Sequence, residues 1–440
     1  MSEREEQLKN AKECANTIRF KTEDGKVHPN QPARVMPNQK LKEIFGIENA
    51  FTSLSNKRPF IAKAENLMLE AMNCQKDTPD DWTNLRHGAL TYFDEYMNRN
   101  GTRSFKLAEL TQYLTLKISL CYLFDGAHEA LKSDTHFQDV IYIGKRINEL
   151  WIKSKQKDLA ERERPLWKDE TNLHNALRRI TFSAPNVDIG GYPNDATTAD
   201  PLEPSNNPMN LLLPAYETMW RVVLRCFLEV QHRAAGNKTI WTAVLRDYLN
   251  NLQNPNSIEN DVFHRPTEAN GSIIRPVEIV KEALRLYPPT RRVHRCFNNK
   301  EVKADIEACH RQKVLCGDDP NVFRPERWQG LCSNARQAWY DKEGGTIKKL
   351  EDLKKLKTKL KTEEEELGFM PFAYYCAADH INTKEFASKM IALLVAVLCN
   401  GLGDEWILEG SDSLPPYGIP LSSERGEYEE LSLKKAATTK

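Results

Sequence analysis

The sequence predicts a mostly α-helical fold with a small β component, and three observations support this. Apolar residues recur at helical spacing over most of the 440-residue chain. Strand patterns are few and short, at 292–293 and 314–315. The composition, with 40% apolar residues and 62 basic against 62 acidic side chains, is that of an ordinary globular protein. It indicates neither a disordered chain nor a nucleic-acid-binding surface.

The first forty residues differ from the rest in being polar, and Pro29, Pro32 and Pro37 break any helix in their second half. They contain no apolar core of a secretory signal. We therefore expect an intracellular protein that begins with a polar segment. Acidic residues suit a helix N-terminus, so Asp80 and Asp81 predict the start of one helix. Other helices are expected at 41–72, 104–124, 136–153 and 158–184.

The second half of the chain alternates loops with helices. Proline, glycine and asparagine predict loops at 185–208 and 254–276. The run 390–399 has about half of the ~20 apolar residues that span a bilayer, so it predicts a buried helix and no transmembrane segment. The lysine and glutamate runs of 348–366 predict a solvated surface helix. An apolar helix is expected at 210–233, and a short one should end at Pro288 and Pro289.

Two charged motifs stand about forty residues apart. Glu282 and Arg285 are three residues apart on a predicted helix and can pair on one face. The quartet Pro-Glu-Arg-Trp at 325–328 adds a second arginine, Arg327. A buried carboxylate that binds two arginines would fix the helix to this loop. We expect this cluster to be structural.

These two motifs, in this order, resemble the E-x-x-R helix and the P-E-R-F loop of the haem-thiolate monooxygenases, the cytochrome P-450 family. The sequence at 215–218 resembles the A-G-x-[DE]-T pattern of that family, with Ala215 in place of the glycine. Trp82 and Arg86 reproduce its W-x-x-x-R motif. The amino-acid sequences of 211–230 and 282–295 look most like those of fungal branches of the family.

The resemblance implies a single cytochrome P-450-like haem domain over 41–440, preceded at 1–40 by a segment in which the family's membrane anchor and first helix are missing. It implies haem b iron as cofactor, with Arg86 on one propionate and Arg295 on the other. The implied activity, of the kind found in secondary metabolism, inserts one oxygen atom from dioxygen into a lipophilic small molecule. Electrons would come from NADPH through a separate flavoprotein reductase, because no nucleotide-binding glycine motif is present. A cytoplasmic location is expected.

The acid–alcohol pair Glu217 and Thr218 lies among apolar residues, where an unpaired polar group costs roughly 1–3 kcal/mol. In one interpretation Thr218 bonds back to the carbonyl of Pro214 and Glu217 turns outwards. In the other, Pro214 distorts the helix just before Thr218, and the pair supplies protons for oxygen activation as it does in the resembled family. We favour the second interpretation.

The loop that carries the axial cysteine in the family differs here. Cys376 follows Phe372 by four residues, where the family has seven, and the loop glycine and arginine are missing. Counting back six residues from Phe386 gives His380. Three alternatives remain: Cys376 binds the haem iron as a thiolate, His380 takes that position, or the chain binds no haem. The last alternative would make the protein an inactive relative or a binding scaffold. An isomerase of the same family is less favoured, because isomerases do not need the proton relay.

Overall fold

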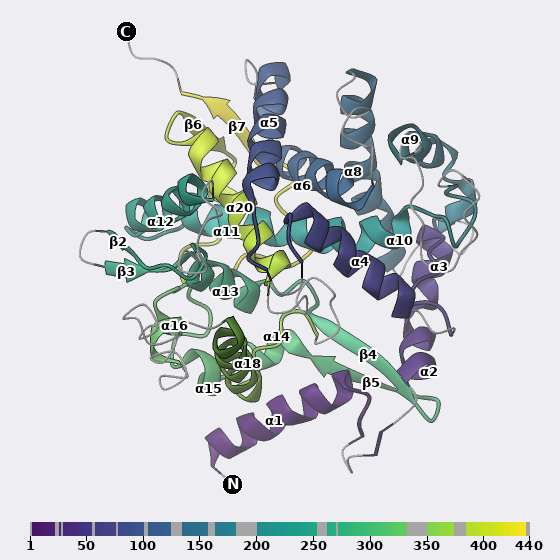
Figure 1. Ribbon diagram of the computed structural model, residues 1–440, viewed down its shortest axis with the longest axis horizontal. Coiled ribbons are helices and arrows are strands. Elements are labelled where there is room, and N and C mark those ends of the chain that lie inside the picture. The colour runs from purple at the N-terminus through teal and green to yellow at the C-terminus, as the bar shows by residue number, and fades with distance from the viewer. Residues whose placement is uncertain are drawn as a thin grey trace.

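Three apolar helices form the centre of the molecule (Figure 1): α6 (Leu107–Leu123), α11 (Thr218–His232) and α20 (Phe386–Leu402). Nearly every side chain of α6 and α20 is buried. Helix α20 is apolar on almost all sides, as a helix in the centre of a protein is expected to be, whereas α6 also buries polar residues such as Gln112 and Lys117. Helix α20 packs against α11 and against α12 (Lys238–Asn251). It contains 390–399, so the predicted buried helix is confirmed.

The computed structural model describes most of the chain, and all structural statements refer to these parts. They are 2–22, 26–27, 30–54, 58–75, 78–100, 104–124, 134–156, 163–181, 200–252, 262–269, 272–331, 350–373 and 384–436.

The other helical segments surround the central three, in agreement with a mostly α-helical fold. They are α1 (Glu3–Ile18), α2 (Asn30–Val35), η1 (Met36–Asn38), α3 (Gln39–Phe45), α4 (Arg58–Ala71), α5 (Thr83–Asn100), α8 (Asp134–Lys155), η3 (Trp167–Asp169), α9 (Thr171–Thr181), α10 (Met209–Leu212), η4 (Leu213–Glu217), α13 (Pro276–Leu286), α14 (Ile306–Cys309), α15 (Lys313–Cys316), α16 (Arg327–Gly330), α18 (Leu350–Glu366) and η6 (Ser411–Ser413).

The β component is small and its described pairings are antiparallel. The strands are β1 (Phe105–Lys106), β2 (Thr267–Ala269), β3 (Ser272–Ile274), β4 (Arg292–Phe297), β5 (Lys300–Asp305), β6 (Trp406–Glu409) and β7 (Ser432–Lys435). They form a sheet in the order β1-β7-β6 and the two hairpins β2–β3 and β4–β5.

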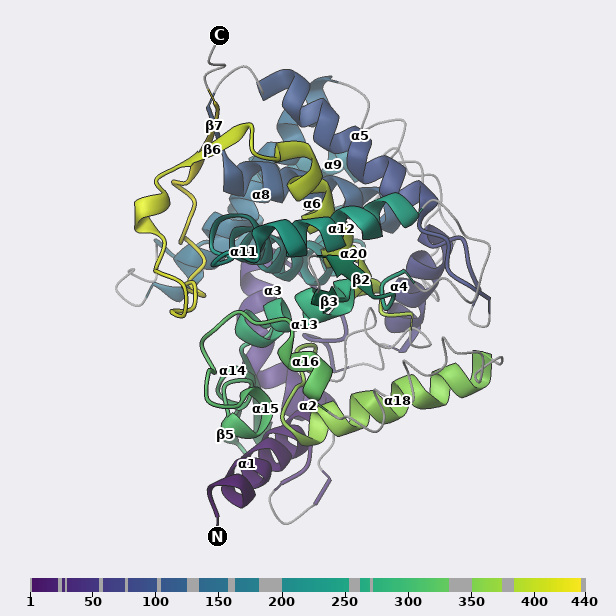
Figure 2. The same cartoon turned by 90° about the vertical axis from the view of Figure 1, so that its left-hand side faces the viewer.

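The N-terminal segment contains α1, a helix that the sequence analysis did not predict. Ser2 and Glu5 form a capping box at its start. Its buried residues, Ala11, Cys14, Ala15 and Ile18, follow the spacing of one helix face. This face packs on β4–β5, and both views place α1 beside that hairpin (Figures 1 and 2). The division of the chain at residue 40 stays a prediction.

Other predicted elements shift or change type. The helix expected at 41–72 is two shorter helices, α3 and α4, and that at 158–184 is η3 followed by α9 within the described residues. The strand at 292–293 is confirmed as part of β4. The strand at 314–315 is wrong: both residues belong to α15, where the backbone N–H of Val314 donates to Gln7 of α1 at 2.8 Å. Two apolar residues are too short a pattern to separate a strand from a helical turn.

Helix α18 covers the run predicted as a solvated surface helix, and the helix is confirmed. One side of it nevertheless docks on the core. Glu364 is buried and accepts hydrogen bonds from Lys281 of α13 at 2.7 and 2.8 Å. Lys357 bonds to Glu385 at the start of α20, at 2.7 Å. Among the helices that the structure describes, none combines the length and the apolar character that crossing a membrane requires.

Candidate functional site

The charged cluster predicted from the two motifs is present, and it joins α13 to the segment that leads into α16. Both oxygens of Glu282 bind Arg285, at 2.7 and 3.0 Å. The same carboxylate accepts from Arg327 at 2.9 Å and from Trp328 at 3.0 Å. All four side chains are buried. The charge of this carboxylate is therefore satisfied entirely by the chain, as a structural role requires.

The helix distortion predicted at Pro214 is also present. The turn from Leu213 to Glu217 is a π-helix, because Pro214 cannot donate a backbone hydrogen bond. Thr218 is the first residue of α11 after this turn. Its Oγ1 lies 3.5 Å from the carbonyl oxygen of Pro214. This contact is at the limit of a hydrogen bond, so the hydroxyl is only weakly held.

Glu217 points inward and is buried. Its carboxylate forms an ion pair with Arg425 of the C-terminal segment and lies 3.5 Å from Nε of Arg221. Burial lowers the pKa of Arg425 to about 9, which still leaves it charged at neutral pH. Glu217 is thus not turned outwards as the first interpretation of this pair requires, and its charge is neutralised inside the protein.

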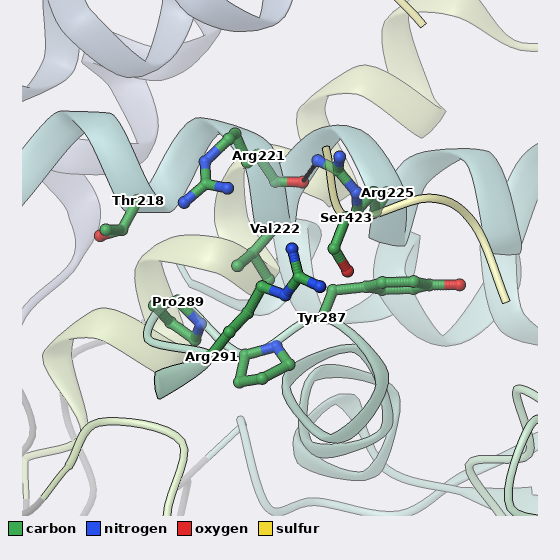
Figure 3. A pocket seen from close by; sticks show the side chains of 9 residues that line it. Thr218, Arg221, Val222, Arg225, Tyr287, Pro289, Arg291 and Ser423 are labelled. Atoms are coloured by element: carbon green, nitrogen blue, oxygen red, sulfur yellow. Dashed lines mark hydrogen bonds between the residues drawn. The ribbon is translucent and has the colours of Figure 1, made fainter. Parts of the chain in front are cut away.

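A small, open pocket lies beside Thr218, between α11, the turn after α13 and the C-terminal segment (Figure 3). Three guanidinium groups line it, those of Arg221, Arg225 and Arg291. The remaining wall is largely apolar. Its residues are Thr218, Val222, Tyr287, Pro288, Pro289 and Ser423. The pocket therefore combines positive charge with an apolar wall.

Trp82 lies just before α5 and packs on Phe386, the first residue of α20, with 5.5 Å between ring centroids. The fold thus brings the W-x-x-x-R motif next to the residue that closes the predicted haem loop, about 300 positions later. The indole N–H of Trp82 donates to Asp80 at 2.7 Å. The same carboxylate binds Lys389 of α20 at 2.6 Å.

Arg86 and Arg295 bond to different elements in the described part of the chain. Nε of Arg86 donates to the carbonyl of Leu249 in α12, at 2.7 Å. Arg295 lies on β4 and donates to the carbonyl of Ile18 at 3.3 Å. Its guanidinium carbon is 4.4 Å from the ring centroid of Phe20. Trp82 and Arg86 therefore lie near α20, whereas Arg295 faces the N-terminal segment.

Cys376 and His380, the two candidate axial ligands, lie at 374–383, outside the described residues. The residues that border this stretch test whether an anionic cofactor such as haem fits. Lys384 and Lys389 are buried, and Lys357 reaches the same region from α18. Desolvation lowers the pKa of Lys384, and the nearby charge of Asp80 opposes this shift.

Two carboxylates, Asp80 and Glu385, face these three amines, and Glu385 also binds His264 at 2.8 Å. Nζ of Lys384 bonds to the carbonyl of Thr78. Lysine amines beside the apolar pair Trp82 and Phe386 are groups of the kind that could hold the carboxylates and the ring of an amphipathic dianion.

Comparison with known proteins places the fold. The solved haem domain of cytochrome P450DA matches with a TM-score of 0.52 and 13% identity, over 97% of this chain and 85% of the other. Ligand-free cytochrome P450 OleT matches with a TM-score of 0.51 and 13% identity, over 93% and 85% of the two chains. The chain has the cytochrome P450 fold. The predicted fold class, mostly helical with one domain, is confirmed over nearly the whole length.

No family model matches the sequence, and no curated protein matches it either. A further solved cytochrome P450 aligns with a TM-score of 0.50 at 14% identity, over 92% of this chain. At such low identity the P450 fold is what these similarities establish. The fungal character and the altered haem loop stay predictions.

Sequence reasoning missed the arginines of the pocket. A signal for two of them was present, because Glu217, Arg221 and Arg225 are spaced four residues apart in an otherwise apolar segment. Such spacing places all three on one helix face. Arg291 and Arg425 carried no comparable signal, since only the tertiary fold brings them to α11.

Proposed function

We propose that this protein is a haem-dependent oxidoreductase that inserts one oxygen atom from dioxygen into a lipophilic small molecule. The observation that carries the proposal is the π-turn at Leu213–Glu217, which places Thr218 at the mouth of a pocket in a chain of P450 fold. Electrons would come from NADPH through a separate flavoprotein reductase.

The residues proposed to hold haem come from three parts of the chain. Cys376 would bind the iron, with His380 as the alternative ligand. Trp82 and Arg86 would lie on the propionate side, helped by Lys384 and Lys389. The contacts of Arg295 with Ile18 and Phe20 favour a packing role for this residue over a propionate contact. When bound, haem would supply the iron chemistry that activates dioxygen.

The contribution of the start of α11 would be proton transfer. The hydroxyl of Thr218 is weakly held at 3.5 Å from its backbone acceptor, so Oγ1 can turn towards the pocket and pass on a proton. Glu217 is neutralised by Arg425. We therefore assign Thr218 the direct role, and we propose that Glu217 acts only when Arg425 moves away.

A second candidate function, a haem-free binding scaffold, is favoured by one specific contact. Asp80 already accepts the indole N–H of Trp82 and binds Lys389. These are donors that a propionate would use. A chain without haem would need such an internal carboxylate, whereas in a haem protein Asp80 would share the donors with the cofactor.

Haem content separates the two candidates. The protein is produced with haem supplied during expression, and haem per chain is measured as the pyridine complex. We expect close to one haem per chain, with a several-fold lower content in Arg86→Ala. Arg99→Ala, on the same helix and paired with Glu95, is the matched control and should retain haem. No haem in the folded wild-type protein would reject the oxidoreductase proposal and support the scaffold.

A further inference from the structure

Two buried cysteines that are far apart in the sequence meet where α1 packs on the rest of the molecule. Cys14 lies on the buried face of α1, and Cys309 ends α14, the short helix that directly follows β5. Both are free thiols, and they are 6% and 5% exposed. The two thiols are hydrogen-bonded to each other. Their sulfur atoms are therefore neighbours in the fold.

The close approach of α1 to α14 is also seen at Gly368. A Cβ atom at this position would lie 3.4 Å from Cβ of Ala11 and 3.5 Å from Cβ of Cys309. Ala11 precedes Cys14 by one turn on the same buried face of α1. Figure 2 shows α1 at the bottom of the molecule, below β5 and α14. One glycine thus contacts both helices, which places Cys14 beside Cys309 independently of the bond between the thiols.

The packing of α1 allows this helix to open without the rest of the protein. Its buried face belongs to a small apolar cluster with β4–β5 and α14, and this cluster is separate from the main core. Arg19, just after the helix, pairs with Glu365 of α18 at 3.0 Å in a partly exposed contact. Segments with few buried contacts open locally at a lower free energy than global unfolding. Such opening would expose both thiols to a reagent in solution.

The hydrogen bond makes the two thiols chemically unequal. It raises the pKa of Cys14, and burial adds to this effect. The same bond lowers the pKa of Cys309, while burial acts in the opposite direction. The thiolate is the reacting form of cysteine, so Cys309 is the nucleophile of the pair and Cys14 is the second thiol.

We propose that Cys14 and Cys309 form a reversible disulfide that locks α1 onto α14, with a small-molecule disulfide such as oxidised glutathione as the oxidant. The thiolate of Cys309 attacks one sulfur of the oxidant, the sulfur–sulfur bond of the oxidant breaks, and a mixed disulfide forms. Cys14 then attacks the Cys309 sulfur and displaces the second half of the oxidant. The two leaving thiolates take up the two protons of the cysteines. The pair is thus oxidised by two electrons, and the oxidant is reduced to two thiols.

The inference goes beyond the proposed function, because the disulfide needs neither haem nor turnover. Reversible disulfides of this kind are typical of redox-responsive proteins in reducing compartments. The expected consequence is mechanical: the oxidised protein holds α1 covalently, whereas the reduced protein holds it only through its small apolar cluster and its polar contacts.

Peptide mapping tests whether the disulfide forms. The reduced protein is equilibrated with oxidised glutathione, free thiols are blocked with N-ethylmaleimide, and unreduced digests are analysed by mass spectrometry. We expect the peptide pair that joins Cys14 to Cys309 to be the main oxidised species, and dithiothreitol to remove it. Cys14→Ser and Cys309→Ser should each abolish the pair. Cys316→Ser is the matched control and should keep it, because Cys316 is buried on α15 but donates to the carbonyl of Gln312 at 2.9 Å.

Hydrogen exchange of the same samples tests whether the disulfide locks α1. The amides of α1 should exchange about tenfold more slowly in the oxidised wild type than in the reduced protein, because local opening is suppressed. The amides of α12, which lies outside this cluster, should exchange equally in both. In Cys14→Ser the oxidant should leave the exchange of α1 unchanged.

Three results would overturn the proposal. In the first, both cysteines remain thiols in oxidised glutathione. In the second, a glutathione adduct persists on Cys309 or a different cysteine pair predominates. In the third, the joined peptides form but α1 exchanges equally in the oxidised and reduced proteins. The wild type decides the question if a serine variant does not fold, because both measurements are made on it directly.

Discussion

Two buried networks of charged side chains, one around Glu282 and one at the start of α20, differ in the groups that they bring together. At Glu282 one carboxylate binds two arginines and a tryptophan, and Asp319 adds a second carboxylate to Arg327 at 2.9 Å. At the start of α20, by contrast, three lysines face Asp80 and Glu385. The first network needs nothing from outside the chain. The second contains amines of the kind that bind anionic groups, so we propose a structural role for the first network and a role in cofactor binding for the second.

The largest expected loss of stability is at the network around Glu282. Glu282→Ala would leave Arg285 and Arg327 buried without their shared carboxylate, at a cost of roughly 3–5 kcal/mol in the free energy of unfolding. We expect little folded protein in soluble extracts. Glu13→Ala, which breaks the exposed pair with Lys9, is the control and should change stability by less than about 1 kcal/mol. If Glu282→Ala melts like the wild type, the cluster is not the element that fixes this part of the fold.

His310 borders the Glu282 network through the carbonyl of Arg285, and we expect it to make stability depend on pH. Its Nε2 accepts the N–H of Met370, so Nδ1 carries the proton and donates to the carbonyl of Arg285, at 3.1 Å. Burial lowers the pKa of His310 from 6.5 to about 3. The unfolded chain therefore binds a proton below pH 6.5 that the folded protein does not bind until about pH 3.

This difference predicts that stability falls as the pH is lowered from 6.5 towards 3, by up to about 1.4 kcal/mol per pH unit. Above pH 6.5 the contribution is constant. Urea unfolding of the wild type and of His310→Gln between pH 4 and 8 measures it, because glutamine keeps a donor and an acceptor but does not titrate. Equal slopes in the two proteins would contradict the assignment.

A smaller effect is expected at the network we assign to the cofactor. Asp80→Asn removes the counter-charge of Lys389 and weakens the bond to Trp82, so unfolding should become easier by about 1–3 kcal/mol. Haem content should stay the same or rise, because the donors become available to a propionate. Loss of haem in folded Asp80→Asn would mean that Asp80 helps to build the haem site rather than compete with a propionate for these donors.

The smallest effect on stability is expected at Thr218. Its hydroxyl makes only a 3.5 Å contact, so Thr218→Ala should change the free energy of unfolding by at most about 0.5 kcal/mol. If haem binds, the fraction of reducing equivalents that reaches product should fall and peroxide should rise. Thr242→Ala removes a hydroxyl that donates to the carbonyl of Lys238 on α12, at 2.7 Å, and is the control for coupling. Unchanged coupling in Thr218→Ala would remove Thr218 from the mechanism.

The parts of the fold that sequence could predict are those with a strong local pattern. The long apolar run of α20, the proline-induced turn before Thr218 and the pairing of Glu282 with Arg285 all follow from neighbouring residues. Helix α1 was missed because its buried face is small, and α15 was mistaken for a strand because its pattern is two residues long. Local patterns of this size do not distinguish the alternatives.

The candidate site was less predictable because its groups meet through the tertiary fold. Asp80 and Lys389 are 309 positions apart, and Arg425 reaches Glu217 from the C-terminal segment. Neither partner has a pattern that identifies the other. The sequence could name Trp82 and Thr218 through motifs, but it could not show that Trp82 already has an internal carboxylate.

The central proposal is that a haem held by Cys376 lies beside the lysines at the start of α20, and the absorption spectrum of the reduced carbon monoxide complex tests it most directly. A thiolate-bound haem absorbs at a distinctly longer wavelength than an imidazole-bound one. We predict the thiolate spectrum for the wild type and for His380→Ala, and its loss in Cys376→Ala. An imidazole spectrum that His380→Ala abolishes would contradict the claim.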